Sequence, residues 1–305
     1  MNRYLVQRII YSCVSLVGLV VLVFFLARLT GNPADLYLPI NTPIEIREEF
    51  SKLHGLNDSV WVQFGQYASN LARLDLGESL RQQRPALTIV LEAFPTTLML
   101  SAYAMTLVLA ISIIAGSLAA RKPNGLFDRI VSLIALASAS IPNFWLAIVS
   151  VLVFSVWLQW LPTSGTGSFV HWVLPVMVLT IRPCGIIAQV VRSSMIDALS
   201  SAYVKTARAK GVRKRSIIFV HALRNAMLPV MTVAGDQAAS MINGAVIVEM
   251  IFGFPGIGKL MIDSISNREF VVVQAAVIVV AVVIFIMNIL IDLTYVMLDP
   301  RIRHD

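Results

Sequence analysis

The sequence predicts an all-α polytopic membrane protein with six transmembrane helices. Of its 305 residues, 57% are hydrophobic and only 13% are charged, and the mean hydropathy is +0.79. Soluble domains average about 45–50% apolar and about 25% charged residues, so this composition excludes an ordinary soluble enzyme. Disorder is excluded as well, because disordered chains combine low hydrophobicity with high net charge. Apolar runs of about 20 residues recur along the chain, and each is long enough to cross a bilayer.

Breaker residues and charged turns separate the six expected spans. The first span is longer than a signal-peptide core and no small-residue cleavage site follows it, so we interpret it as an uncleaved helix. The third is too long for one straight helix perpendicular to the membrane and contains Pro142, which predicts a tilt or kink. The expected spans are residues 9–27, 95–118, 130–158, 173–191, 228–251 and 271–296.

Lysine and arginine are unevenly distributed between the two sets of span ends. One set carries 15 of the 24 basic residues and the other carries seven, while Arg28 and Arg182 lie in or at the edge of spans. The positive-inside rule places the richer set in the cytoplasm. Because six crossings return the chain to its starting side, both termini are expected to be cytoplasmic, in a multi-pass protein of the bacterial inner membrane.

Three segments follow from these spans. They are an N-terminal transmembrane helix (1–30), a periplasmic helical insertion (31–94), and a five-helix core (95–305) whose cytoplasmic loop covers residues 192–225. The insertion has two helix signals: a capping box at Thr42 and Glu45 around Pro43, and a second amphipathic stretch after Ser59 that runs toward Gly77. The insertion either packs on the spans or forms a docking surface for an external partner, and both interpretations remain open.

The sequence contains no convincing catalytic motif. Residues 253–259 match the first seven positions of a phosphate-binding loop, but Leu260 has no hydroxyl for magnesium and Pro255 lacks a backbone donor. We therefore interpret this segment as an external turn that closes the fifth span. No histidine is paired with a glutamate at metal-binding spacing. The chain itself is not expected to be an enzyme or to bind a cofactor or a metal.

A basic segment between the fourth and fifth spans is the most informative part of the chain. Residues 192–224 hold eight of the 15 cytoplasmic charges. Within it, small side chains before Gly211 predict a short helix that can approach a groove on another protein closely. The alternative is a basic loop that only anchors the topology. The candidate contact residues are Tyr203, Lys205, Thr206, Ala207, Arg208, Ala209, Lys210 and Gly211.

These residues, and several other motifs of the sequence, resemble those of a known protein family. The run YVKTARAKG (203–211), followed by HALRNAMLP (221–229), resembles the cytoplasmic coupling loop of ABC importer permeases, in the dipeptide, oligopeptide and nickel branch. The general importer pattern has a glutamate that is absent here, where Lys205, Thr206 and Ala207 precede Gly211. Further motifs occur in the order expected for the branch: DLGESL (75–80), SIPNFWLA (140–147), LPTSG (161–165), FPGIGKL (254–260) and LDPRIR (298–303).

The resemblance implies a complex rather than a protein that works alone. This chain and a second homologous permease subunit would form a translocation pathway in membrane lipid, and two cytoplasmic ATP-binding subunits would use ATP and Mg²⁺ and drive it through residues 203–211. A periplasmic or extracellular substrate-binding protein would deliver the substrate, and no nucleic acid is expected. Short peptides are the expected substrate, with nickel chelates, glutathione or opines as alternatives.

Polar residues inside the spans are candidates for the translocation pathway, because a charge in the membrane is costly and usually functional. Arg182 and Asp236 lie at similar depth if each helix rises 1.5 Å per residue, so they either pair or face the pathway separately. A rival class, an ATP-independent secondary transporter, would be expected to show repeated halves, and none is visible. The pathway candidates are Arg182, Asp236, Asn243 and Glu249.

Overall fold

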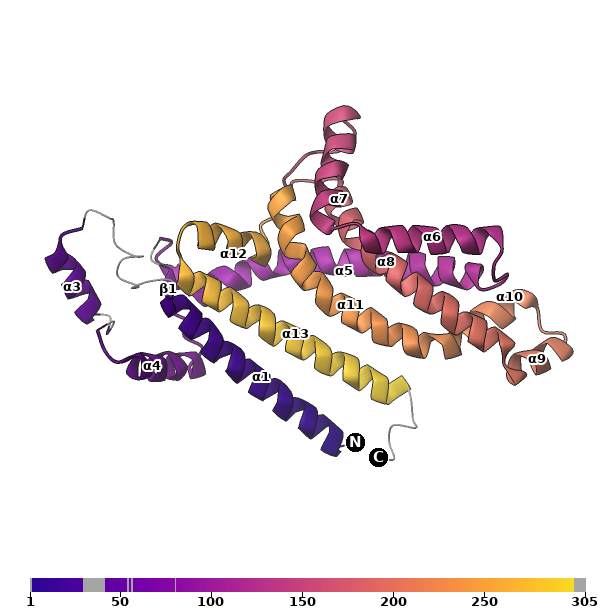
Figure 1. Cartoon of the computed structure of the whole chain (residues 1–305), viewed down its shortest axis with the longest axis horizontal. Helices are drawn as coiled ribbons and strands as arrows, with labels where there is room; N and C mark the ends of the chain where they lie inside the picture. The colour runs from indigo at the N-terminus through magenta and orange to yellow at the C-terminus, as the bar shows by residue number, and fades with distance from the viewer. Residues whose placement is uncertain (1, 30–41, 54, 56, 80, 299–305) are drawn as a thin grey trace. The chain divides into compact units, whose positions relative to one another are not determined.

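The computed structural model describes residues 2–29, 42–53, 55, 57–79 and 81–298 (Figure 1). These residues form two compact units. The first unit comprises Thr96–Phe254 and the end of the last helix from Ile286, and the second comprises Asn2–Pro95 with Pro255–Phe285. The second unit thus joins the first span and the insertion to a segment near the C-terminus, a grouping that the sequence analysis did not anticipate.

In the residues described, the first unit consists of helices joined by turns and loops and contains no strand. It contains π-helical segments, marked η, one directly after the short helix α7 and one directly before the long helix α11. Its elements are α5 (Ala86–Ala119, from Thr96 on), α6 (Leu126–Ser140), α7 (Asn143–Ser150), η1 (Val151–Trp157), α8 (Phe169–Ser200), α9 (Ala202–Ala209), α10 (Lys214–Ser216), η2 (Ile217–Ala222), α11 (Leu223–Phe252) and the end of α13 (Phe270–Leu298).

Apolar length confirms the all-α polytopic fold. Among the described residues, five helical stretches are long and apolar enough to cross a membrane, and a sixth crossing results if the bent pair of α6 and α7–η1 counts as one span. This pair breaks next to Pro142, as predicted, but its 101° bend is far sharper than a kink. The 15 residues of α6 reach only about 22 Å, short of a bilayer core of about 30 Å.

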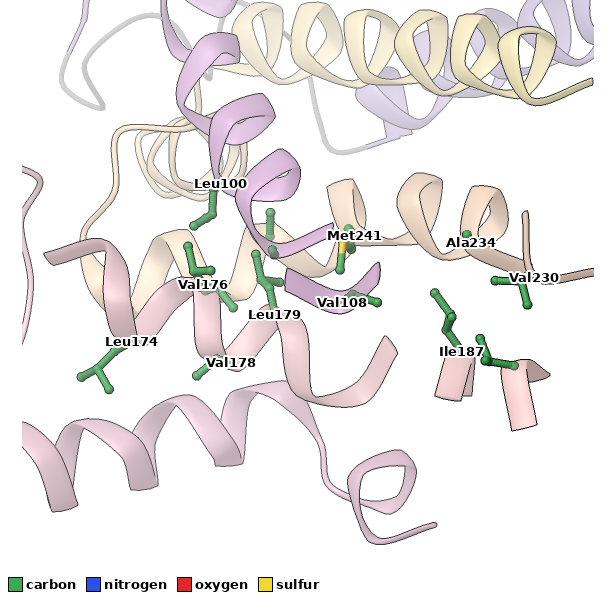
Figure 2. Close-up of a cluster of buried hydrophobic side chains, with 14 of the residues drawn as sticks. Leu100, Val108, Leu174, Val176, Val178, Leu179, Ile187, Val230, Ala234 and Met241 are labelled. Carbon is green, nitrogen blue, oxygen red and sulfur yellow. The ribbon is translucent and has the colours of Figure 1, made fainter. Parts of the chain in front are cut away.

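Helix α8 organises the core of the first unit by packing against both α6 and α11. Figure 2 shows apolar side chains of α5, α8 and α11 gathered together, among them Leu100, Leu179 and Met241. Glycine permits the closest approaches: a Cβ at Gly116 of α5 would lie 2.6 Å from the carbonyl oxygen of Ala188 in α8. A Cβ at Gly185 would lie 2.0 Å from the Ser138 hydroxyl of α6. These contacts fix α8 between its neighbours.

The second unit contains the two helices predicted for the insertion. Ser59 caps the second of them as expected, but that helix ends at Ala72, earlier than the predicted end near Gly77. A short hairpin and the helix α12 were not predicted. The elements are α1 (Asn2–Leu29), α3 (Ile44–Leu53), α4 (Val60–Ala72), β1 (Glu78–Ser79), β2 (Arg84–Pro85), the start of α5, α12 (Ile257–Ser266) and α13 as far as Phe285.

Two sets of contacts hold this second unit together. The rings of Phe24 in α1 and Phe64 in α4 pack with centroids 5.3 Å apart, so the insertion packs on the first span. The carboxylate of Glu269 accepts hydrogen bonds from the Ser79 hydroxyl (2.8 Å) and the Arg81 backbone N–H (2.9 Å). Buried apolar residues of α5, α12 and α13 lie next to this contact. A docking role for the insertion stays a prediction.

Candidate functional site

A cavity of about 460 Å³ lies between α7, α8 and α11 of the first unit. Its volume falls in the range of about 300–1,000 Å³ that is usual for small-molecule sites. Apolar side chains form much of its wall, and amides, a hydroxyl and a guanidinium form the rest. The lining residues are Pro142, Asn143, Phe144, Leu179, Arg182, Pro183, Ile186, Gln237, Ser240, Met241, Asn243, Gly244 and Ile247.

Local sequence explains how these groups meet. Pro142 is the extended residue before α7, so the chain turns sharply there and presents Asn143 and Phe144 to the cavity. Pro183 interrupts the hydrogen-bond ladder of α8 directly after Arg182, because proline has no N–H to donate to the carbonyl of Leu179. On α11, a Cβ at Gly244 would lie 3.4 Å from the Asn143 amide nitrogen, so glycine leaves this amide room.

The structure brings two of the four predicted pathway residues together. Arg182 and Asn243 both line the cavity, whereas Asp236 and Glu249 do not. Asp236 is exposed and accepts a hydrogen bond from the amide of Gln237 (3.3 Å). Glu249 is fully buried near the end of α11, where its backbone carbonyl accepts the N–H of Phe254 (2.9 Å). A pathway role for Asp236 or Glu249 stays a prediction.

The ion pair considered for Arg182 and Asp236 is not formed in this structure. Among the described residues, the salt bridges found do not include either side chain. The second possibility, in which each residue faces the pathway separately, stays a prediction, because Arg182 lines the cavity and Asp236 does not.

Sequence reasoning missed three polar residues of the cavity: Asn143, Gln237 and Ser240. A signal for two of them was present, because Gln237, Ser240 and Asn243 recur every third residue along α11 and so share one helical face. No comparable signal existed for Asn143, which reaches the cavity only because of the 101° bend before α7.

The predicted short helix exists as α9 and ends in a Schellman motif. The N–H of Val212 donates to the carbonyl of Ala207 (3.1 Å), and the N–H of Gly211 donates to the carbonyl of Arg208 (3.0 Å). Gly211 has a φ of +75°, in the left-handed region that glycine adopts without strain. The predicted helix break at Gly211 is thereby confirmed.

Helix α9 is anchored by one side chain and presents the others to solvent. Val204 is fully buried, where α9 packs against α8 and η2, and Ala207 is half-buried. The remaining candidate contact residues, Tyr203, Lys205, Thr206, Arg208, Ala209, Lys210 and Gly211, are exposed. In Figure 1, α9 and α10 lie where α8 ends, away from α7. This gives a small, basic, fixed surface at one end of the unit.

A buried ion pair joins α6 to α8 on the way to α9. Arg192 donates from Nε and Nη2 to the two carboxylate oxygens of Asp128, and the Asp128 side chain is only 3% exposed. The N–H of Asn124, in the turn before α6, donates to the same carboxylate (2.7 Å). Bidentate pairs of this kind combine charge with fixed geometry. From the sequence, Arg192 was expected only as one of the cytoplasmic basic residues, and its pair with Asp128 was not predicted.

Comparison with known proteins gives consistent matches along the whole chain. The chain is 34% identical to the dipeptide transport system permease protein of Alkalihalophilus pseudofirmus, covering 100% of both chains. It is 36% identical to a di/tripeptide transport system permease protein of Pseudomonas aeruginosa, covering 100% of this chain and 99% of that one. It is 35% identical to a glutathione transport system permease protein of Escherichia coli, again covering 100% of both.

A solved structure and a family model agree with these relatives. The inward-facing MetNI methionine ABC transporter contains a chain that matches with a TM-score of 0.59 and 15% identity, covering 69% of this chain and 96% of that chain, which supports the fold. Residues 112–304 match the family model described as the inner membrane component of binding-protein-dependent transport systems. The resemblance noted in the sequence is thereby confirmed, and the chain belongs to this family of inner-membrane transport components.

Proposed function

We propose that this chain and a second homologous permease form the translocation pathway of an ATP-driven importer of short peptides. One observation carries the proposal: a cavity whose wall includes several polar side chains occurs in a chain whose full-length relatives are named as permeases for dipeptides, di/tripeptides and glutathione. Two cytoplasmic subunits would bind ATP and Mg²⁺, and an external binding protein would deliver the peptide. Glutathione, itself a modified tripeptide, is the second candidate substrate because of its named permease relative.

The exposed surface of α9 supplies the link to the ATP-binding subunits. A short helix held by Val204 and ended by a hydrogen-bonded glycine moves as a rigid body, so it transmits the closure of a partner to α8 and η2. A secondary transporter that works without ATP has no use for such a surface. The basic side chains of α9 favour an acidic groove on the partner.

Reconstitution tests the proposed function. The chain is purified from its native membrane with the subunits that remain bound to it, and the complex is placed in proteoliposomes. We expect uptake of a radiolabelled dipeptide that requires ATP, Mg²⁺ and the binding protein, whereas the isolated chain hydrolyses no ATP. Uptake without ATP, driven by an ion gradient, would assign the chain to the secondary transporters instead.

Cysteine labelling tests the topology and the bent span together. With Cys13 and Cys184 replaced, single cysteines are introduced at Asn57 and Lys214, both exposed, and intact cells are treated with a membrane-impermeant thiol reagent. If α6 and α7–η1 cross the membrane as one span, the two positions lie on opposite sides. We expect labelling at position 57 and none at position 214 until the cells are opened. Labelling at both positions in intact cells would mean that the bent pair returns to the side from which it enters.

A further inference from the structure

The described residues that line the cavity between α7, α8 and α11 carry a single formal charge, which is positive. Within the described part of the chain, Arg182 is the one charged residue that lines it. Arg182 lies near the middle of α8, the 14th of 32 residues, in a helix long and apolar enough to span a membrane. A guanidinium at such a depth is costly unless a counter-charge or water satisfies it. A negative group bound in the cavity would supply such a counter-charge.

Among the described residues, no carboxylate forms an ion pair with Arg182. The two acidic residues of α11, Asp236 and Glu249, both lie outside the cavity lining. Asp236 instead accepts the hydrogen bond from Gln237. The five N–H donors of a guanidinium form a planar fork that matches a carboxylate in a bidentate arrangement.

The rest of the lining suits the other parts of a peptide. The amides of Asn143, Gln237 and Asn243 each offer donors and acceptors, which peptide groups require in equal measure. Phe144, Met241 and Ile247 add apolar surface of the kind that side chains of varied shape contact without specific hydrogen bonds. One cation, several amides and an adaptable apolar wall are what a carrier of diverse short peptides needs, because only the backbone and the termini are shared by all of them.

We propose that Arg182 binds the C-terminal carboxylate of the peptide during its passage through this cavity. The inference rests on the proposed function and deepens it, because it names the ligand group and the residue that recognises it. Charge-assisted hydrogen bonds of this kind are worth about tenfold to a hundredfold in affinity.

Uptake by arginine variants is the first test. The complete complex, reconstituted with its binding protein, is assayed for kcat/KM of a radiolabelled dipeptide. R182Q should lower it about tenfold to a hundredfold, and R182K should lower it less, because lysine keeps the charge but loses the planar fork. The matched control is Arg129→Gln, which removes an exposed arginine of α6 outside the cavity and should leave uptake near the wild-type rate. Co-purification of the partner subunits with each variant reports assembly.

Competition on the unaltered complex is the second test, and it does not depend on the folding of a variant. A dipeptide with a photoreactive side chain is crosslinked to the wild-type complex without the binding protein. Excess unlabelled dipeptide should suppress crosslinking to cavity residues, whereas the C-terminal amide of the same dipeptide should not. Equal competition by acid and amide, absence of crosslinking in the cavity, or wild-type uptake by R182Q would overturn the role of Arg182. If the wild-type complex transports no peptide, the proposed function is wrong, and the inference that depends on it is wrong too. If wild type and R182Q both take up peptide normally, only the inference about Arg182 is wrong.

Discussion

Gly211→Val should reduce substrate uptake at least tenfold while the chain remains in the membrane. The φ of +75° at this position is disfavoured for every residue with a Cβ and most for a β-branched one, at a cost of about 1–3 kcal/mol. Valine would relieve that strain by leaving the left-handed region, and the two hydrogen bonds that end α9 would break. Under the proposed function, a frayed α9 would no longer transmit the motion of the ATP-binding subunits. Uptake and ATP hydrolysis are measured together in membranes with matched protein levels.

Gly211→Asn is the matched control, because asparagine tolerates the left-handed conformation better than any other residue with a polar side chain. Apart from the two chain neighbours, no heavy atom of the described residues lies within 4 Å of a Cβ built at position 211, so the Cβ of either variant meets open space. If uptake is lost in the valine variant only, uptake depends on the backbone conformation at position 211. If uptake is also lost in the asparagine variant, the partner's groove has no room for any side chain at position 211. Normal uptake by the valine variant, or by Ala207→Trp on the half-buried side of the helix, would exclude α9 from coupling.

The spans were predictable because lipid leaves the backbone few choices. A chain in hydrocarbon must satisfy every N–H and C=O internally, so an apolar run of sufficient length forms a helix. The ends of the helices were harder to predict. Helix α8 continues to Ser200, nine residues beyond the predicted end of its span at residue 191, because outside the membrane a polar helix is as acceptable as an apolar one. For the same reason much of the segment expected as a loop, residues 192–225, is helical.

The candidate site depends on angles that no local pattern encodes. A rise of 1.5 Å per residue gave Arg182 and Asp236 similar depths, but depth does not say which way a side chain points. Successive helical residues differ by about 100° in direction, so Gln237 lines the cavity while its neighbour Asp236 does not. Pro142 signals a break, yet the 101° angle that carries Asn143 to the cavity follows from packing against α8 and α11.

The Asp128–Arg192 pair illustrates a further limit, because its partners are 64 residues apart in the sequence. An aspartate in the first turn of a helix is usual on its own, since it favours the positive end of the helix dipole. Only the folded chain shows that the carboxylate also receives the guanidinium of α8 and the N–H of Asn124. The pair fixes the start of α6 to the part of α8 that leads to α9, so it holds the surface that the proposed function assigns to contact with ATP-binding subunits.

Removing one partner of this pair should destabilise the protein severely. Arg192→Ala strands a carboxylate that is 3% exposed, and the loss of one partner of a buried ion pair costs about 3–5 kcal/mol. Asp128→Asn keeps the size of the side chain but removes its charge, and should cost less, because the Arg192 side chain is 23% exposed and retains some hydration. The double change Asp128→Ala with Arg192→Ala should cost less than the sum of the two alanine variants, because no charge remains buried alone. Thermal unfolding of the purified complex in detergent, together with the amount of folded protein in membranes, measures these differences. Strictly additive losses across this cycle would show that the two side chains stabilise α6 and α8 independently.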